Sequence, residues 1–167
     1  MRPSQETPTP SQNVVSALIL VLLLGVLAFG IQQLVALNRT DDDINARRAA
    51  VAAASTEVRA LTSVSASTTD ADLTKILDGA TSDFRTQFKA QADVFRKSLQ
   101  DAKVTSKASI VSAGLVSHSD TTATVLVAAT GTVTNAKSTD AQPRNYRLRV
   151  DLTLVSGNWL VSGMDFV

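Results

Sequence analysis

Apolar residues dominate one long stretch near the N-terminus and then recur with two different periods along the rest of the chain. From Val14 to Leu37 there is no charged residue, and Val14 to Ile31 is almost wholly apolar. As a helix rising about 1.5 Å per residue, residues 14–37 span roughly 36 Å, enough to cross a bilayer with some tilt. The pattern predicts a single transmembrane helix with anchor positions at Val14, Leu18, Leu22, Leu24, Leu27, Ile31 and Leu37.

Two other structures can contain an apolar stretch of this kind. A helix buried in a protein core would need protein on every side, and the remaining chain is too small to surround it. A cleaved secretory signal has a basic start, a shorter apolar centre and a small-residue cleavage site, whereas only Arg2 precedes this stretch and no convincing site follows it. We therefore expect an uncleaved anchor at residues 14–37, preceded by a proline-rich disordered tail at residues 1–13.

A helical period follows the anchor and predicts a helix from about Asp41 to Leu61. Its apolar positions repeat every seven residues with an offset of three, which gives a narrow seam formed by Ile44, Val51, Ala54, Val58 and Leu61. This seam suits a partner helix, through Ile44, Val51 and Val58, and it suits packing on the chain's own sheet equally well. We interpret residues 38–68 as an alanine-rich juxtamembrane helix and loop.

Two further helices are predicted after the Ser/Thr-rich loop over residues 63–69. The residues from Thr69 to Asp72 have the pattern of a capped helix start, and Gly79 marks the end of that short helix. A longer helix from about Ser82 to Asp101 carries large apolar residues on one face: Phe84, Phe88, Phe95 and Leu99. These side chains predict hydrophobic core, with an aromatic ligand pocket as the less favoured interpretation.

From Val104 onward the period becomes twofold, which is typical of strands. The predicted strands cover residues 106–117, 121–133, 146–154 and 159–166, with an exposed loop over 135–143 and a tight hairpin turn at 156–158. Arg147 and Arg149 alternate with apolar residues of the third strand, so they lie on a solvated face or contact an acidic partner or lipid headgroups. Helices followed by hairpin-paired strands predict an α+β domain over residues 69–167, with about three helices packed on a curved four-stranded antiparallel sheet.

Composition narrows the chemistry that the chain can perform. Sixteen basic residues nearly balance fifteen acidic ones, so we expect no nucleic-acid partner. The absence of cysteine excludes disulfides, iron–sulfur clusters and thiolate zinc sites. His118 is the single histidine, expected in an exposed turn, and no hydrolase or nucleotide-binding motif occurs. We therefore expect no metal, no cofactor and no enzymatic activity.

The order of these elements, with the run LDGATSDFRTQF from Leu77 to Phe88 and the terminal LVSGNWLVSGMDFV, resembles the actinobacterial Mce-associated membrane proteins. The resemblance implies a cone-shaped domain similar to ketosteroid isomerases and nuclear transport factor two, and to periplasmic scaffold domains of type IV secretion. It also implies a single-pass plasma-membrane protein with an extracytoplasmic C-terminal domain. Counting Arg39, Arg47 and Arg48 against Arg2 weakly favours the opposite orientation.

The function implied by this resemblance is that of a non-enzymatic accessory subunit. Such a subunit docks on and stabilises an Mce-type complex that imports lipids or sterols, so its expected partners are Mce proteins, the permease and membrane lipid. Two alternatives have the same architecture. One is a scaffold subunit of a type IV secretion-like system, and the other is a domain that binds a lipid within its cone.

Overall fold

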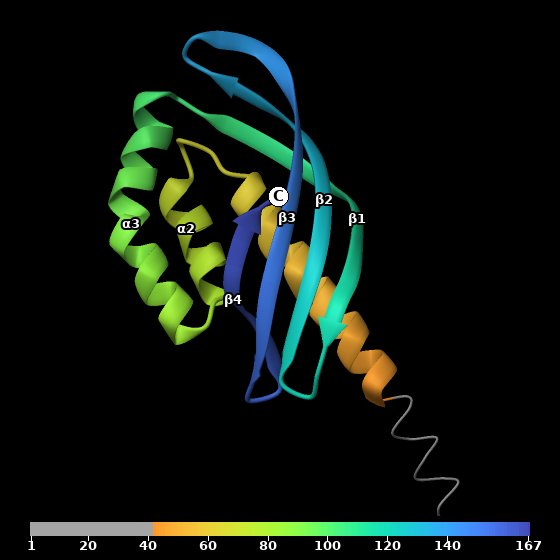
Figure 1. The fold of residues 1–167 in the computed structure, drawn as a ribbon. Coiled ribbons are helices and arrows are strands. Elements are labelled where there is room, and N and C mark those ends of the chain that lie inside the picture. The colour runs from red at the N-terminus through yellow and green to blue at the C-terminus, as the bar shows by residue number, and fades with distance from the viewer. Residues whose placement is uncertain (1–41) are drawn as a thin grey trace, which may run out of the picture. The chain divides into compact units, whose positions relative to one another are not determined.

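A computed structural model of the chain describes residues 42–167, which form three helices and four strands (Figure 1). A first helix over residues 42–62, called helix 42–62 below, precedes α2 (Thr69–Asp78) and α3 (Ser82–Asp101). The strands are β1 (Thr105–His118), β2 (Thr122–Asn135), β3 (Ser138–Val155) and β4 (Asn158–Phe166). They pair antiparallel in the order β1-β2-β3-β4. The predicted α+β fold, with three helices on a four-stranded antiparallel sheet, is confirmed.

Helix 42–62 packs directly on the sheet and supplies one side of the main core. Its Ala50, Ala54 and Val58 are completely buried. They contact the inward-facing residues of three strands, which include Val125, Val127, Leu148, Val150, Leu152 and Val161. Small alanines let the helix approach the strands closely, so the predicted seam packs on the chain's own sheet. One compact unit runs from Asn45 to Val167, and the boundary predicted between residues 68 and 69 falls inside it.

The helices α2 and α3 lie beside the β4 edge of the sheet (Figure 1). Backbone hydrogen bonds fasten their connection to that edge: the Thr81 amide donates to the Val161 carbonyl at 2.9 Å, and the Val161 amide donates to the Gly79 carbonyl at 2.8 Å. A second, smaller core contains Val64, Ile76 of α2 and Leu99 of α3. The connection between α2 and α3 is therefore held against the sheet at Gly79.

The hairpin of β2 and β3 is longer than the sequence predicts. The loop expected over residues 135–143 is wrong, because β3 begins at Ser138 and pairs Pro143 opposite Thr132. Only two residues, 136 and 137, connect the strands. The Asn135 side-chain oxygen accepts backbone hydrogen bonds from Lys137 and Ser138, both at 2.9 Å, which stabilises this turn. Residues 138–143 are mostly polar because this part of the hairpin has no buried face, and not because it is a loop.

The hairpin turn between β3 and β4 is confirmed. Ser156 and Gly157 connect the strands with φ values of +49° and +82°. Two successive positive φ angles are the mark of a type I′ turn, whose twist matches that of the paired strands. This turn sets the register that places Trp159 and Val161 in the main core.

Candidate functional site

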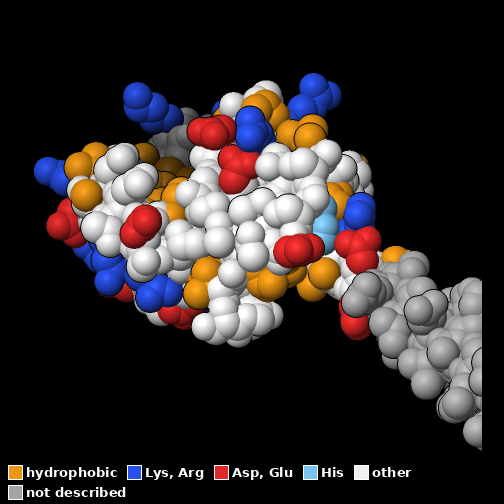
Figure 2. Space-filling view, turned by 60° about the horizontal axis from the view of Figure 1, so that its bottom comes forward, with side chains coloured by type: hydrophobic (Ala, Val, Ile, Leu, Met, Phe, Trp, Pro, Cys, Tyr) orange, Lys and Arg blue, Asp and Glu red, His pale blue; other side chains and the backbone are white. Residues whose placement is uncertain are grey.

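Acidic and basic side chains are interspersed on the face of the molecule that Figure 2 shows. The arrangement agrees with the near balance of charge in the sequence. A functional site in the described part of the chain is therefore better sought in its concave surfaces. Two cavities stand out, one beside α3 and one between helix 42–62 and α2.

The first cavity, called the α3 groove, has a volume of about 530 Å³ and a mainly apolar lining. Three phenylalanines of α3 form a row along it, with ring centroids 6.3 Å apart for Phe84 and Phe88 and 6.1 Å apart for Phe88 and Phe95. Apolar side chains from outside α3 complete the lining, namely Leu61, Ile76 and Met164. The spacing of the phenylalanines along one helix face produces this row, because residues three, four and seven apart lie on the same side.

The three phenylalanines pack against the two cores, as the sequence predicts, but they are less buried than core residues usually are. Leu99 is buried, whereas Phe84, Phe88 and Phe95 are only half-buried. Val94 at the rim is 70% exposed. Exposed polar side chains of the same helix, Gln87, Gln91 and Ser98, border the groove. An apolar centre with a polar rim is the usual anatomy of a protein interface or ligand site.

The second cavity, called the Glu57 cavity, has a volume of about 480 Å³ and contains a buried carboxyl group. Glu57 lies on helix 42–62 and is only 9% exposed. Its carboxylate rests directly on Gly79, so closely that a Cβ atom at Gly79 would fall 1.7 Å from Oε1 of Glu57. Within residues 42–167 this carboxylate has no hydrogen-bond or ion-pair partner. A buried polar group in this state is costly and calls for a physical explanation.

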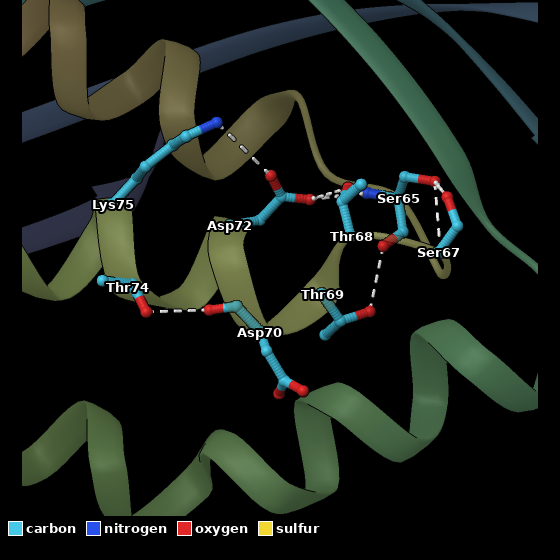
Figure 3. Close-up of polar contacts among 8 residues, drawn as sticks. All are labelled: Ser65, Ser67, Thr68, Thr69, Asp70, Asp72, Thr74 and Lys75. Carbon is cyan, nitrogen blue, oxygen red and sulfur yellow. Dashed lines mark hydrogen bonds and ion pairs between the residues drawn. The ribbon is translucent and has the colours of Figure 1, made fainter.

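The far wall of the Glu57 cavity comes from α2, whose start is organised by Asp72 (Figure 3). The Asp72 carboxylate accepts hydrogen bonds from the Ser65 amide at 3.0 Å and from the Thr68 hydroxyl at 2.8 Å. Its other oxygen lies 3.8 Å from the Lys75 ammonium. The helix begins at Thr69, as the sequence predicts, but its N-cap residue is Thr68. The Thr69 hydroxyl does not cap the helix and donates to the Ser65 carbonyl at 2.9 Å.

The environment of Glu57 changes its proton affinity. Burial, and to a smaller extent the negative charge of nearby Asp78, raise the pKa of the Glu57 carboxyl from 4.5 to about 7. Desolvation disfavours the charged form, and a neighbouring acid adds repulsion. Near neutral pH this group can therefore hold a proton, release it, or accept hydrogen bonds from a cation.

Besides Glu57, the titratable side chains that line this cavity are Arg59, Asp72, Lys75 and Asp78. The histidine and the tyrosine lie elsewhere, since His118 packs against Trp159 with ring centroids 5.7 Å apart and Tyr146 packs against the main core. His118 is half-buried, so the expectation of an exposed turn residue at this position is wrong. Across residues 42–167 no three His, Cys, Asp or Glu side chains gather closely enough to hold a metal ion.

The positions predicted to contact a partner are scattered. Val58 is completely buried in the core and cannot meet a partner, while Val51 is half-buried and Ile44 is 39% exposed. Arg147 and Arg149 lie on the exposed outer face of the sheet, where Arg149 forms an ion pair with Asp151 at 3.3 Å. The structure therefore does not bring these five positions together into one surface.

The predicted anchor lies outside the described residues, from Val14 to Leu37. Among the helices described over residues 42–167, none is long and apolar enough to span a bilayer.

Glu57 is not among the candidate residues predicted from the sequence. The signal that could have revealed it is an acid within an apolar helix face, because Glu57 follows Ala54 by three residues and precedes Leu61 by four. An acid at such a position must either meet a cation or shift its pKa.

Comparison of the sequence with known proteins gives one family and one relative. The family model described as "Uncharacterized protein Rv1363c/MT1408-like" matches residues 11–167. "Uncharacterized protein Rv1363c" of Mycobacterium tuberculosis is 33% identical over 96 residues, which are 58% of this chain and 37% of the relative. The matched region thus spans a little over a third of the length of that relative.

Solved structures with a similar fold include three proteins whose sequences are only distantly similar. The periplasmic domain of DotI has a TM-score of 0.59 at 12% identity, covering 70% of this chain and 91% of that one. The VirB8 homologue CagV of Helicobacter pylori has a TM-score of 0.56 at 12% identity, covering 70% and 95%. An IcmL-like type IV secretion system protein of Legionella pneumophila has a TM-score of 0.53 at 14% identity, covering 70% and 85%. At these identities the comparison shows a shared fold.

Proposed function

We propose, from the premise that the chain belongs to the Rv1363c/MT1408-like family, that it is a non-enzymatic structural subunit of a multiprotein complex in the cell envelope. Residues 14–37 anchor it in the plasma membrane, and residues 42–167 form a docking domain on the extracytoplasmic side. The observation that most supports this proposal is the fold, which over 70% of this chain resembles two proteins from type IV secretion systems and the periplasmic domain of DotI.

The α3 groove is the docking surface in this proposal, and its occupant is an apolar patch of a partner subunit. Its polar rim and its highly exposed Val94 favour a protein partner over an enclosed lipid, since a lipid-carrying cavity surrounds its ligand on most sides. Lipid in the groove is the other outcome that the tests below distinguish.

Copurification from native membranes tests the proposal. The full chain carrying an affinity tag is cross-linked in cells, extracted in mild detergent and analysed by mass spectrometry. We expect stoichiometric recovery of subunits of one envelope complex. Mce proteins and a permease would assign the chain to a lipid import complex, as the sequence resemblance implies, whereas secretion-channel subunits would assign it to a secretion-like system. Recovery of the chain alone, or with bound lipid only, would contradict the proposal.

Orientation in the membrane has a separate test. Lys137→Cys places a single thiol in the exposed β2–β3 turn of a chain that has no cysteine of its own. We expect an impermeant thiol reagent to label this variant in intact cells whose outer wall has been permeabilised. Labelling that appears only after lysis would place the domain in the cytoplasm and reverse the proposed orientation.

A further inference from the structure

We propose that the Glu57 cavity is a binding site for a cationic side chain, the ammonium of a lysine or the guanidinium of an arginine, which a partner subunit inserts between helix 42–62 and α2. This inference rests on the proposed function, because it assumes a partner subunit. It concerns a different surface from the α3 groove, since the two cavities share no lining residue.

In the described part of the chain, Glu57 lacks the partner that a buried acid usually has. Glu57 is only 9% exposed and lines the cavity, and its carboxylate has no hydrogen-bond or ion-pair partner within residues 42–167. Gly79 leaves the space in which the carboxylate lies, since any side chain there would collide with it. A buried acid is normally matched by a cation or by hydrogen-bond donors. Within residues 42–167, Glu57 makes no contact of either kind.

The basic residues around the cavity have other partners or are exposed to solvent. The Lys75 ammonium is 3.8 Å from Asp72, and its side chain is 71% exposed. On α3, Arg85 donates from Nε to the Leu77 carbonyl at 2.9 Å and from Nη2 to the Ala80 carbonyl at 3.4 Å, at the end of α2. Arg59 also lines the cavity but is exposed.

The acidic residues that line the cavity differ in their exposure and in the partners that they already have. Asp78 is exposed and close enough to act electrostatically on Glu57, so it can meet an approaching cation first. Asp72 is already satisfied by the Ser65 amide and the Thr68 hydroxyl. Glu57 and Asp78 therefore remain to hold the cation. An ammonium or guanidinium supplies several donors to a pair of carboxylates, which an uncharged ligand cannot do as well.

Binding of a cation is linked to ionisation of Glu57. A cation prefers the carboxylate to the neutral acid, so binding lowers the pKa of Glu57 and becomes tighter as pH rises through 7. The sequence offers a direct reporter, because it contains only two glutamates, Glu6 in the N-terminal tail and Glu57. Labelling of the full chain with glutamate enriched in ¹³C at the side-chain carboxyl therefore gives two NMR signals, one of which is an internal control.

The experiment titrates the labelled full chain in detergent micelles with butylammonium and with methylguanidinium, the side-chain analogues of lysine and arginine. At 100 mM probe we expect the apparent pKa of Glu57 to fall by about half a unit or more, while Glu6 follows the effect of 100 mM NaCl alone. Asp78→Asn should reduce the fall. A Glu57 signal that responds to the probes no more than to NaCl would overturn the proposal.

A second arm decides whether the cation belongs to a partner. Glu57→Gln keeps the shape of the side chain and removes its charge, and Asp140→Asn, at an exposed position in the β2–β3 hairpin, is the matched control. We expect Glu57→Gln to lower partner recovery in the copurification at least several-fold and Asp140→Asn to leave it unchanged. Equal recovery by both variants would overturn the partner assignment while the proposed function stands. A wild-type chain recovered alone would instead contradict the proposed function itself.

Discussion

Replacing Glu57 with glutamine should stabilise the protein at neutral and alkaline pH, although it removes a buried charged residue. In the folded chain the carboxylate lies against Gly79 and has no partner within residues 42–167, and in the unfolded chain water solvates it. Ionisation therefore costs more in the folded state than in the unfolded state. Glutamine has nearly the same shape and carries no charge at any pH, so it avoids this cost.

The pKa of the group gives the size and the sign of the effect. A carboxyl with a pKa of about 7 in the folded state and 4.5 when unfolded binds more protons folded than unfolded between those values. The free energy of unfolding of the wild type therefore falls as pH rises from 4.5 to 7. The full shift corresponds to about 3 kcal/mol, and screening by water in the open cavity lowers this to about 1–3 kcal/mol.

Thermal unfolding at several pH values measures this difference. Trp159 is the single tryptophan and is 9% exposed in the core, so its fluorescence reports on the folded domain. We expect Glu57→Gln to match the wild type at pH 4.5 and to exceed its Tm by roughly 4–12 °C at pH 8. All other titrating groups are common to both proteins, so the difference isolates Glu57. Melting curves that shift in parallel over the whole pH range would refute the reasoning.

Three further changes test other parts of the structure. Gly79→Ala should displace the Glu57 carboxyl toward water and return its pKa toward 4.5, measured by the carboxyl ¹³C signal, and an unchanged pKa would contradict the close contact. Val58→Ala, at a completely buried site, should lower the free energy of unfolding in urea by about 1–2.5 kcal/mol, against less than about 0.5 kcal/mol for Val111→Ala at a 65% exposed site. Val94→Asp in the α3 groove should reduce partner recovery several-fold, whereas equal losses with Val111→Asp on β1 would exclude the groove as the docking surface.

Much of the fold can be predicted from the sequence because the spacing of apolar residues along the chain indicates which residues face a core. The 3.6-residue period and the twofold period correctly separate the helices from the strands, and the Ser156–Gly157 turn follows from local conformational preference. The extension of β2 and β3 over residues 138–143 is missed because both of its faces meet water. The polar residues of this segment indicate that it is exposed, but they do not indicate whether it pairs as a strand.

The candidate site is less predictable because it depends on contacts between distant segments. The phenylalanines of α3 are recognisable from their spacing, but their half-burial depends on how far α3 lies from Leu61 and Met164. Glu57 and Gly79 are 22 positions apart in the chain and meet only because α2 ends against β4. The raised pKa of Glu57 follows from burial in this folded arrangement and from the nearby charge of Asp78, and not from its neighbours in sequence.

The loss of stability predicted at high pH and the proposed cation-binding site have the same origin, which is that Glu57 lacks a counter-charge within the described residues. If a cation completes the cavity, it must also relieve the cost of ionisation, because a ligand that binds only the folded, deprotonated state stabilises it. Butylammonium at 100 mM should therefore raise the Tm of the wild type at pH 8 relative to the same concentration of NaCl, and it should leave the Tm of Glu57→Gln unchanged. A rise of equal size in both proteins would mean that the amine acts on the surface generally. The cavity would then carry an acid that is costly in the folded state and binds nothing.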